Sequence, residues 1–438
     1  MSDPASEPSF RLEIAGLPES FVVVAFTGSE AISEPFVFDV ELLIGDTPLD
    51  LAGLLYRSVW LSFDAGGRGI HGQIHELVQH RQGAGCRVRI GPKLACLAQR
   101  FSQRVFSARS VPQIIRQVLK AHGIAGRQVC LALSGDYPLR DFCTQYRESD
   151  LQFLQRVCAE AGIYFHFEQA RDGHCLVFAD STDDSLPDGE TLYGLEGTAP
   201  AVRNWRVQSD VSGEQVALGR SDLMGLHCGR TLSLAGHPVE GWNQPWLLTK
   251  VEHRAQAGVY GNHFRAIPAG WPFVATGVAA KPRMLSRQRG WVVTVDEPQM
   301  QVAGRVAVQF DWVYQGEGAS PSHCWLPLAP ELAAWGHAIG KGTEVLVSFI
   351  EGDPDRPLIS ALLDAPASRE DADESPLSET SQPVHEGSGF DPLLLAAIQS
   401  AEPLVLLCLL PGGGSFNPCS QPLCTCRMLT QLGAGAAP

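Results

Sequence analysis

The chain has 438 residues, of which 45% are hydrophobic and 18% charged, and its formal net charge is −15. This length allows roughly three globular domains with ordinary cores, and the acidic balance opposes a nucleic acid or an anionic membrane surface as the main partner. The 44 glycines and 30 prolines favour many short strands joined by turns over long helices.

No segment is typical of an export signal or a membrane span. The N-terminus, MSDPASEPSFRLEIAG, lacks a basic region followed by an apolar one, so we expect no signal peptide. The longest apolar stretch, residues 392–410, is interrupted by Pro403 and contains Glu402, which makes it a poor membrane span. The 12 cysteines are too dilute for a disulfide scaffold, and we expect the first eight to be reduced thiols of a cytoplasmic chain.

The N-terminal part of the chain alternates strand patterns with turns. In FRLEI, residues 10–14, apolar and charged residues alternate, which indicates a strand with one buried face. FVVVAFTG, PFVFDVELLIGD, SVWLSF and CRVRIGP are similar runs that end near Gly, Pro or Asp. We predict that residues 1–105 form a first β-barrel.

Two helices with marked ends follow in residues 106–180. Ser110 and Gln113 form a capping box at the start of the first helix, and Ser149 and Gln152 form another at the start of the second. A glycine follows each apolar stripe and suits the helix C-terminus. We predict an α/β unit that supports neighbouring β-barrels.

A strand pattern follows the second helix directly. Residues alternate between two faces of this strand, and we expect one set of side chains to face a core and the other set to lie on the opposite face. The two sets are Ile163, Phe165 and Phe167, and Tyr164, His166 and Glu168.

The remaining chain divides by composition. VRNWRVQ and PWLLTKVEHRA predict strands in residues 181–270, and a proline-rich linker follows in residues 271–284. GWVVTVD, GRVAVQFDW, CWLPLA and TEVLVSFI are closely spaced short strands that predict a small barrel of the OB type in residues 285–364. Residues 365–389 are typical of a disordered linker, and residues 390–438 form an apolar tail that contains cysteines.

Several segments together resemble a known family. In the first half they are FSARSVPQIIRQVLKAHGI, YPLRDFCTQYRESDLQFLQRVCAEAGIYFHFE and DGHCLVFADS. In the second half they are AGHPVEGWNQPWLLTKVEHRA, GRVAVQFDW, SHCWLPLAP and GTEVLVSFIEGDPDRPLISALL. In this order, and over most of residues 10–364, they resemble VgrG, the spike protein at the tip of bacterial type VI secretion systems. The most specific combination is YRESD followed by the αβ unit, with EGDPDRP further on.

The resemblance implies a fold and a set of partners. The fold is mainly β, with two phage-tail-hub-like β-barrels, inserted α/β pieces and an OB-like barrel after them. The implied assembly is a homotrimer that caps a tube of Hcp rings, contacts baseplate components, and carries a PAAR-type tip protein and an effector or adaptor into a target cell. The family's core performs no chemistry, so the resemblance implies no catalytic residue, no cofactor and no metal site.

The sequence departs from the family in two places. Between Trp205 and Ser221 it is shorter, so we expect a shortened second hub barrel within residues 181–270. After PGGGSFN, where the family continues into a β-helix needle, residues 418–438 follow instead. The chain is then either a short form with its own ending or the product of a truncated coding sequence. Its tail is expected to pack on the OB-like barrel or to attach a tip protein or effector.

Two groups of metal-ligand residue types occur. His71 and His75 would share one face of a strand while His80 points the other way, so scattered strand histidines are favoured over a ligand set. The spacing of the four tail cysteines is not that of a zinc knuckle, and incidental thiols are favoured over a structural zinc site or a disulfide formed after export. These cysteines are Cys408, Cys419, Cys424 and Cys426.

A carboxylate pair for glycan cleavage is the main catalytic alternative. Glu148 and Asp150 lie at a predicted helix start, where negative charge complements the helix dipole, so a structural role is favoured over catalysis. Arg147 is expected to form an ion pair within the fold or at a subunit contact. Neither a P-loop nor a G-x-S-x-G motif is present.

Four tryptophans could form stacking platforms for nucleobases on an OB-like barrel. The acidic balance, the few lysines nearby and the apolar neighbours favour a core and interface role instead. These residues are Trp291, Trp312, Trp325 and Trp335.

Three hypotheses about function follow. The first is a structural spike hub that is secreted without a signal peptide. The second is a spike whose tail or barrel carries a hydrolytic or metal-dependent activity. The third is the hub of a phage-derived contractile tail that is unconnected with secretion.

Overall fold

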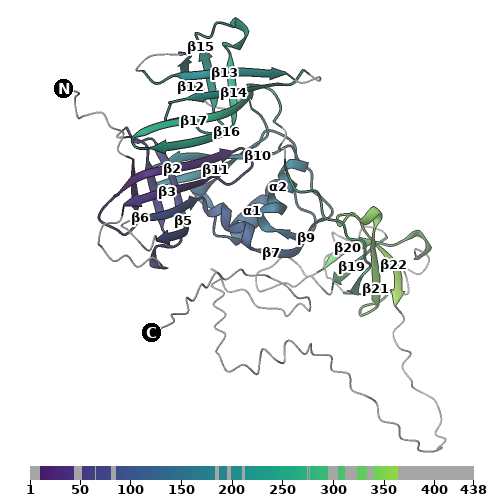
Figure 1. Ribbon diagram of the computed structural model, residues 1–438. Coiled ribbons are helices and arrows are strands. Elements are labelled where there is room, and N and C mark those ends of the chain that lie inside the picture. The colour runs from purple at the N-terminus through teal and green to yellow at the C-terminus, as the bar shows by residue number, and fades with distance from the viewer. Residues whose placement is uncertain are drawn as a thin grey trace, which may run out of the picture. The chain divides into compact units, whose positions relative to one another are not determined.

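A computed structural model describes residues 10–43, 52–64, 66–79, 85–182, 187–194, 199–209, 213–273, 275, 277–293, 304–310, 323–332 and 339–363. Within these ranges the chain is mainly β. It forms a 12-stranded sheet and smaller sheets of five, three and two strands, with two α-helices inserted (Figure 1). The predicted fold class is confirmed.

A closed β-barrel forms the N-terminal part. Its strands lie in the order β1-β4-β5-β6-β3-β2, and the ring closes where Arg11 and Leu12 of β1 pair with Val22 and Phe21 of β2. The alternating strand patterns place aromatic side chains inside, and the rings of Phe26 and Phe63 stack with centroids 5.3 Å apart. The strands are β1 (Arg11–Ile14), β2 (Phe21–Ala31), β3 (Val37–Leu43), β4 (Ser58–Ser62), β5 (Gly69–Gln79) and β6 (Gly85–Gly91).

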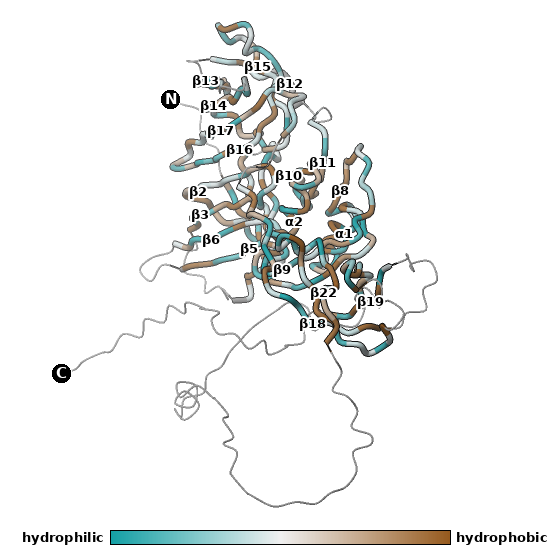
Figure 2. The backbone as a smooth tube through the Cα atoms, turned by 90° about the vertical axis from the view of Figure 1, so that its right-hand side faces the viewer, coloured by the Kyte–Doolittle hydropathy of each residue, from teal (hydrophilic) through white to brown (hydrophobic). Residues whose placement is uncertain are grey.

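A half-barrel continues the same sheet. Strand β16 pairs with β2 from Ala25 to Ala31, so the two barrels share one run of hydrogen bonds. At the far side, β13 pairs with β14, and among the described residues it meets the end of β12 only through the bridge between Tyr193 and Val202. The strands are β12 (Pro187–Leu192), β13 (Val202–Ser209), β14 (Gln215–Ser221), β15 (Thr231–Ala235), β16 (Pro245–Gln256) and β17 (Val259–Pro268). Polar and apolar stretches alternate along these strands (Figure 2).

The α/β unit lies between the two barrels in sequence. The apolar stripe of the first helix is buried in the same hydrophobic cluster as the closed barrel. Strand β8 pairs parallel to β11, which pairs antiparallel to β10, and β7 pairs with β9 as a separate ribbon. The elements are β7 (Phe101–Phe106), α1 (Val111–Ala121), β8 (Val129–Ala132), β9 (Cys143–Ser149), α2 (Asp150–Glu160), β10 (Tyr164–Ala170) and β11 (Gly173–Ala179).

Strand β10 is buried on both faces at its start, which the alternating pattern did not indicate. Phe165 and Phe167 join the cluster of the closed barrel and helices, as predicted. Tyr164 is also buried, because it packs with Ile32, which directly follows β2 of the closed barrel, and with Leu247 of β16. The strand therefore lies between two cores, and its aromatic content reflects both.

A small five-stranded barrel ends the described chain. Its order is β20-β19-β18-β21-β22, and the parallel bridge between Leu328 and Ile359 joins its two ends. The strands are β18 (Gln288–Val292), β19 (Arg305–Phe310), β20 (Cys324–Pro327), β21 (Glu344–Phe349) and β22 (Pro357–Leu363). Short 3-10 turns occur at Ala52–Leu54, Lys93–Gln99, Gly126–Gln128, Glu240–Trp242 and Ile350–Gly352.

Candidate functional site

The junction between β9 and α2 carries the YRESD motif and both predicted features of the helix start. The N–H of Gln152 donates to Ser149 Oγ at 3.2 Å, and the N–H of Ser149 donates to Gln152 Oε1 at 2.9 Å. This confirms the second capping box. At α1, the N–H of Ser110 donates to Gln113 Oε1 at 3.0 Å, which confirms the first.

Asp150 is fully buried and has several donors. Its Oδ1 accepts hydrogen bonds from Arg104 Nη2 at 2.7 Å and Gln145 Nε2 at 2.8 Å, and His122 Nε2 lies 2.7 Å from Oδ2. Burial alone would raise the pKa of Asp150, but the hydrogen bond from His122 and the charge of Arg104 lower it overall. The carboxylate is therefore ionised and tied to three elements of the α/β unit.

Glu148 has a different partner. Its two carboxylate oxygens accept hydrogen bonds from Arg156 at 2.6 and 3.0 Å, and Arg156 also contacts Glu160 at 2.9 Å. Burial would lower the pKa of Arg156, but the hydrogen bonds and charges of Glu148 and Glu160 raise it overall. The acidic pair of the motif thus serves two separate ion-pair networks. Of the two residues, only Asp150 lies in the first turn of α2, where its charge complements the helix dipole, and Glu148 lies in β9.

Arg147 lies on the surface, and its backbone has a φ of +51°. Its guanidinium carbon is 5.1 Å from the centre of the Tyr146 ring, and it forms no ion pair with any described residue. The predicted ion pair within the fold is therefore not observed there. This arginine stacks on its neighbour instead.

The strand histidines lie in two environments. His71 Nδ1 is 3.2 Å from Nδ1 of His174, a residue that sequence reasoning did not single out, and His75 Nε2 is 3.1 Å from the carbonyl oxygen of Pro92. Burial lowers the pKa of His71 and that of His75, and it lowers the pKa of His174 to about 4. His80 lies outside the described residues. No cluster of three metal-ligating side chains occurs in the described ranges.

A buried charged group that the sequence did not reveal lies at the seam between the closed barrel and the half-barrel. Glu30 Oε1 on β2 is 2.9 Å from Nε2 of His253 on β16 and 3.0 Å from Nδ1 of His227. Burial would raise the pKa of Glu30, but the charges and hydrogen bonds of both histidines lower it to about 2. Tyr260 OH lies 2.7 Å from His253 Nδ1 and completes the chain of hydrogen bonds.

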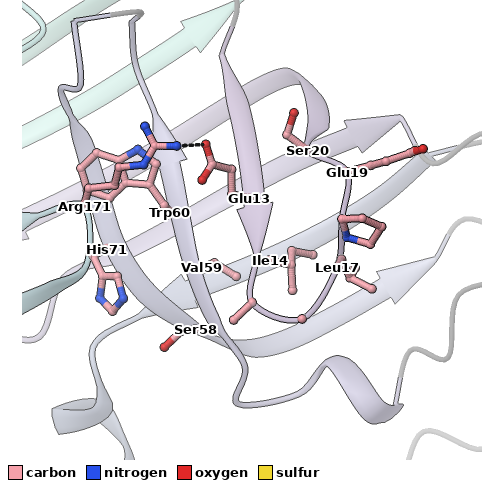
Figure 3. Close-up of a pocket in the computed structure, with 13 residues that line it drawn as sticks. Glu13, Ile14, Leu17, Glu19, Ser20, Ser58, Val59, Trp60, His71 and Arg171 are labelled. Carbon is pink, nitrogen blue, oxygen red and sulfur yellow. Dashed lines mark hydrogen bonds and ion pairs between the residues drawn. The ribbon is translucent and has the colours of Figure 1, made fainter.

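Two open pockets occur in the described part of the chain. The larger of the two, of about 470 Å³, lies beside β1 and β4, and two of its charged residues, Glu13 and Arg171, pair with each other at 2.7 Å (Figure 3). The second, of about 390 Å³, includes Arg68, which pairs with Asp64 at 3.1 Å. Glu13, Arg171 and Arg68 are thus paired within the fold.

The described tryptophans of the small barrel are partly buried on its strands. Trp291 Nε1 donates to Glu344 at 3.3 Å, and Arg289 lies over its ring at 5.8 Å from the centre. Trp325 lies on β20, beside His323. Trp312, Trp335 and the tail cysteines Cys408, Cys419, Cys424 and Cys426 lie outside the described residues, and the eight described cysteines are free thiols. No helix in the described ranges combines the length and apolar character that a bilayer span requires.

Residues 29–220 match the family model described as phage tail baseplate hub (GPD). Among solved structures, the c3393 protein of E. coli has a TM-score of 0.68 and 25% identity, over 80% of this chain and 99% of that chain. That protein is described as a component of the type VI secretion system with structural similarity to the T4 bacteriophage tail proteins gp27 and gp5. The fold and the matched model define the class: this is a tail hub protein.

Two curated relatives narrow the class to a family. The type VI secretion system spike protein VgrG5 of Pseudomonas aeruginosa is 32% identical over 83% of this chain and 58% of that protein. VgrG4b of the same organism is 33% identical over 82% of this chain and 56% of that protein. The chain belongs with the VgrG spike proteins, and it spans a little more than half the length of these two relatives.

Proposed function

We propose that the chain is the structural hub of a type VI secretion spike, a homotrimer that caps the tube of Hcp rings. The observation that carries the proposal is the extent of the likeness to VgrG5, which covers 83% of the chain. A further support is the edge of β13, where the half-barrel is open along most of an eight-residue strand among the described residues. Such an edge is a natural place for a neighbouring copy to pair.

The internal construction suits a part that carries force. Ser33, in the turn after β2, donates its N–H to the carbonyl oxygen of Phe165 at 2.7 Å, and its own carbonyl oxygen accepts from Gln155 of α2 at 2.8 Å. The α/β unit is thus tied to the closed barrel by backbone groups as well as by a shared core. We propose that it braces the barrels and does not bind a substrate.

We propose seven segments along the chain: a first hub barrel, an α/β support region, a shortened second hub barrel, a linker, an OB-like barrel, and a linker and a tail that both lie outside the described residues. Their boundaries are 1–105, 106–180, 181–270, 271–284, 285–364, 365–389 and 390–438. We also propose that baseplate components, a PAAR-type tip protein and an effector or adaptor bind the trimer, and that the chain is cytoplasmic before it is expelled.

Mass measurement across a concentration series, with and without purified Hcp rings, tests the proposal. We expect a mass three times that of the 47.3 kDa chain at high concentration and co-migration with the rings. The proposal would be contradicted by a chain that stays monomeric at high concentration and does not bind the rings. The same measurement on a chain that is deleted from Ala365 onward shows whether the tail contributes to trimer formation or ring binding.

An enzyme-bearing spike is the second candidate. One relative, the actin cross-linking toxin VgrG1 of Vibrio cholerae, is 25% identical over 80% of this chain and 41% of that protein, so a toxin and a hub can occur in one chain. Metal analysis tests this candidate. Stoichiometric zinc that is lost, together with killing activity, on replacing Cys424 and Cys426 would favour the enzyme. Turnover of a cell-wall substrate by the purified chain would do the same.

A further inference from the structure

The segment Asp353–Pro354–Asp355 forms a turn that is held from within. The N–H of Asp353 donates to the carbonyl oxygen of Ile350 at 3.0 Å, and the N–H of Arg356 donates to the carbonyl oxygen of Asp353 at 3.0 Å. The N–H of Asp355 donates to Asp353 Oδ1 at 2.9 Å. These bonds fix the turn and hold the carboxylate of Asp353 within it.

Strand β9 of the α/β unit docks on this turn through one residue. The N–H of Thr144 donates to Asp355 Oδ1 at 2.5 Å, and Thr144 Oγ1 donates to the carbonyl oxygen of Pro354 at 2.9 Å. Thr144 is fully buried, so both hydrogen bonds are shielded from water. Two segments more than 200 residues apart in sequence therefore meet through paired polar groups.

Lys281, which belongs to a third segment, contacts the same turn. It belongs to the stretch between β17 and β18, in which no described residue lies in a helix or strand. Its Nζ lies 2.7 Å from Asp353 Oδ1 and 2.7 Å from Asp355 Oδ2. Burial raises the pKa of Asp355, although Lys281 opposes this, which reflects how little water reaches that carboxylate.

The contact extends into the α/β unit beyond Thr144. The carbonyl oxygen of Thr144 accepts a hydrogen bond from Arg156 at 3.0 Å, and Arg156 is the partner of Glu148. Beside these polar groups, Phe142 is buried in the hydrophobic cluster of the small barrel together with Met284. A peripheral ion pair between Arg305 and Asp141, at 2.6 Å, lies at the exposed rim.

We propose that Lys281, Asp353, Asp355 and Thr144 form an ionic latch that makes the small barrel and the β7–β9 ribbon move as one body. The covalent connection between them runs through residues 269–287, where the described residues lack regular secondary structure, so it cannot set an orientation by itself. Asp355 is 12% exposed, so loss of Lys281 would leave a largely buried carboxylate without its cation, whereas Asp353, at 31% exposed, keeps more contact with water. The inference concerns stiffness within one chain and does not depend on the proposed spike role.

Hydrogen exchange of the full chain, followed by mass spectrometry, tests the latch. Asp355→Ala is expected to speed exchange in the peptide that contains Thr144 by about tenfold or more, because that amide loses its acceptor and the interface opens locally. Asp355→Asn keeps an oxygen acceptor and loses the charge, so a smaller increase is expected. Lys281→Met removes the cation from both Asp353 and Asp355 and leaves the turn in place, so an increase at least as large as that of Asp355→Asn is expected.

The matched control is Asp141→Ala, which removes an ion pair at the same interface from a residue whose side chain is 74% exposed. It is expected to change exchange at Thr144 by less than about twofold. The latch is overturned if Asp355→Ala behaves like Asp141→Ala. It is also overturned if protection falls equally in β3 and β6, because Asp355 would then support the whole fold. Neither result bears on trimer formation or tube binding, which separate experiments measure.

Discussion

Gly229, which precedes β15, has a φ of +82°, and a Cβ atom built there would lie 2.3 Å from Cγ of His166. Both the backbone conformation and the space therefore require glycine. We expect Gly229→Ala to lower the free energy of unfolding by more than about 2 kcal/mol, because the imidazole is itself buried and has little room to move. Denaturant unfolding measures the change.

Gly258 is the matched control for this prediction. It has a similar φ of +80°, but no atom lies within 4 Å of its built Cβ. Gly258→Ala should cost only the backbone strain, about 1 kcal/mol. Equal losses for the two variants would show that the contact with His166 is unimportant.

Glu30 should make the stability of the fold depend on pH. Its folded pKa of about 2 lies below the ordinary value of 4.5, so its ionisation stabilises the fold fully above pH 4.5. This contribution, about 3 kcal/mol, is lost as the pH falls from 4.5 toward 2. We expect Glu30→Gln to be less stable than the natural chain at pH 6, and the gap to narrow steadily below pH 4.5. Unfolding curves at pH 6, 5, 4 and 3 measure it, and a gap that stays constant would contradict the assignment.

At the scale of elements, Arg156 links α2 to β9. It is 3% exposed, and its loss would leave the buried carboxylate of Glu148 unpaired. We expect Arg156→Met to destabilise the chain by about 3–5 kcal/mol and the additional change Glu148→Gln to recover part of that loss. A double-mutant cycle by thermal or denaturant unfolding gives the coupling.

An exposed ion pair provides the comparison for Arg156. Lys250 Nζ and Glu252 Oε1 lie 2.6 Å apart, with side chains that are 45% and 56% exposed. Lys250→Met should therefore change stability by less than about 1 kcal/mol. A loss similar to that of Arg156→Met would mean that burial does not set the strength of these pairs.

Elements with local signals were predicted well. Both helices begin at the predicted capping boxes, because Ser149 and Gln152 need only each other and the backbone between them. The burial of Tyr164 was not predicted, because a period of two reports one packed face and the second face is covered by β16, a strand about 80 residues later in the sequence. For the same reason YRESD showed two carboxylates without showing that Arg104, His122 and Arg156 contact them in the fold.

At the scale of the whole molecule, β2 is shared by the closed barrel and the half-barrel, and Gly28 lies at that seam. It pairs with Phe38 on one side and with His253 on the other. A Cβ at this position would lie 2.1 Å from Cε1 of Phe38, so Gly28→Ala must displace a ring from the barrel core.

We expect Gly28→Ala to reduce hydrogen-exchange protection in β16 and β17 as well as in β3 and β6, because one run of hydrogen bonds joins them. Gly261→Ala, where the built Cβ meets only a backbone oxygen at 3.7 Å, should have little effect. Loss confined to β3 and β6 would show that the two barrels unfold independently.

The sequence by itself determined the elements whose causes lie within a few residues of one another. Capping boxes and alternating strands depend on contacts between near neighbours, and the order of such segments was enough to indicate the family. Only the tertiary structure decided what the charged residues do. Glu30 and His253 are 223 positions apart, and Thr144 and Asp355 are 211 apart. The residues next to a charged side chain in the sequence do not indicate the distant partner with which it will be buried. Those pairings can therefore be seen only in the folded chain.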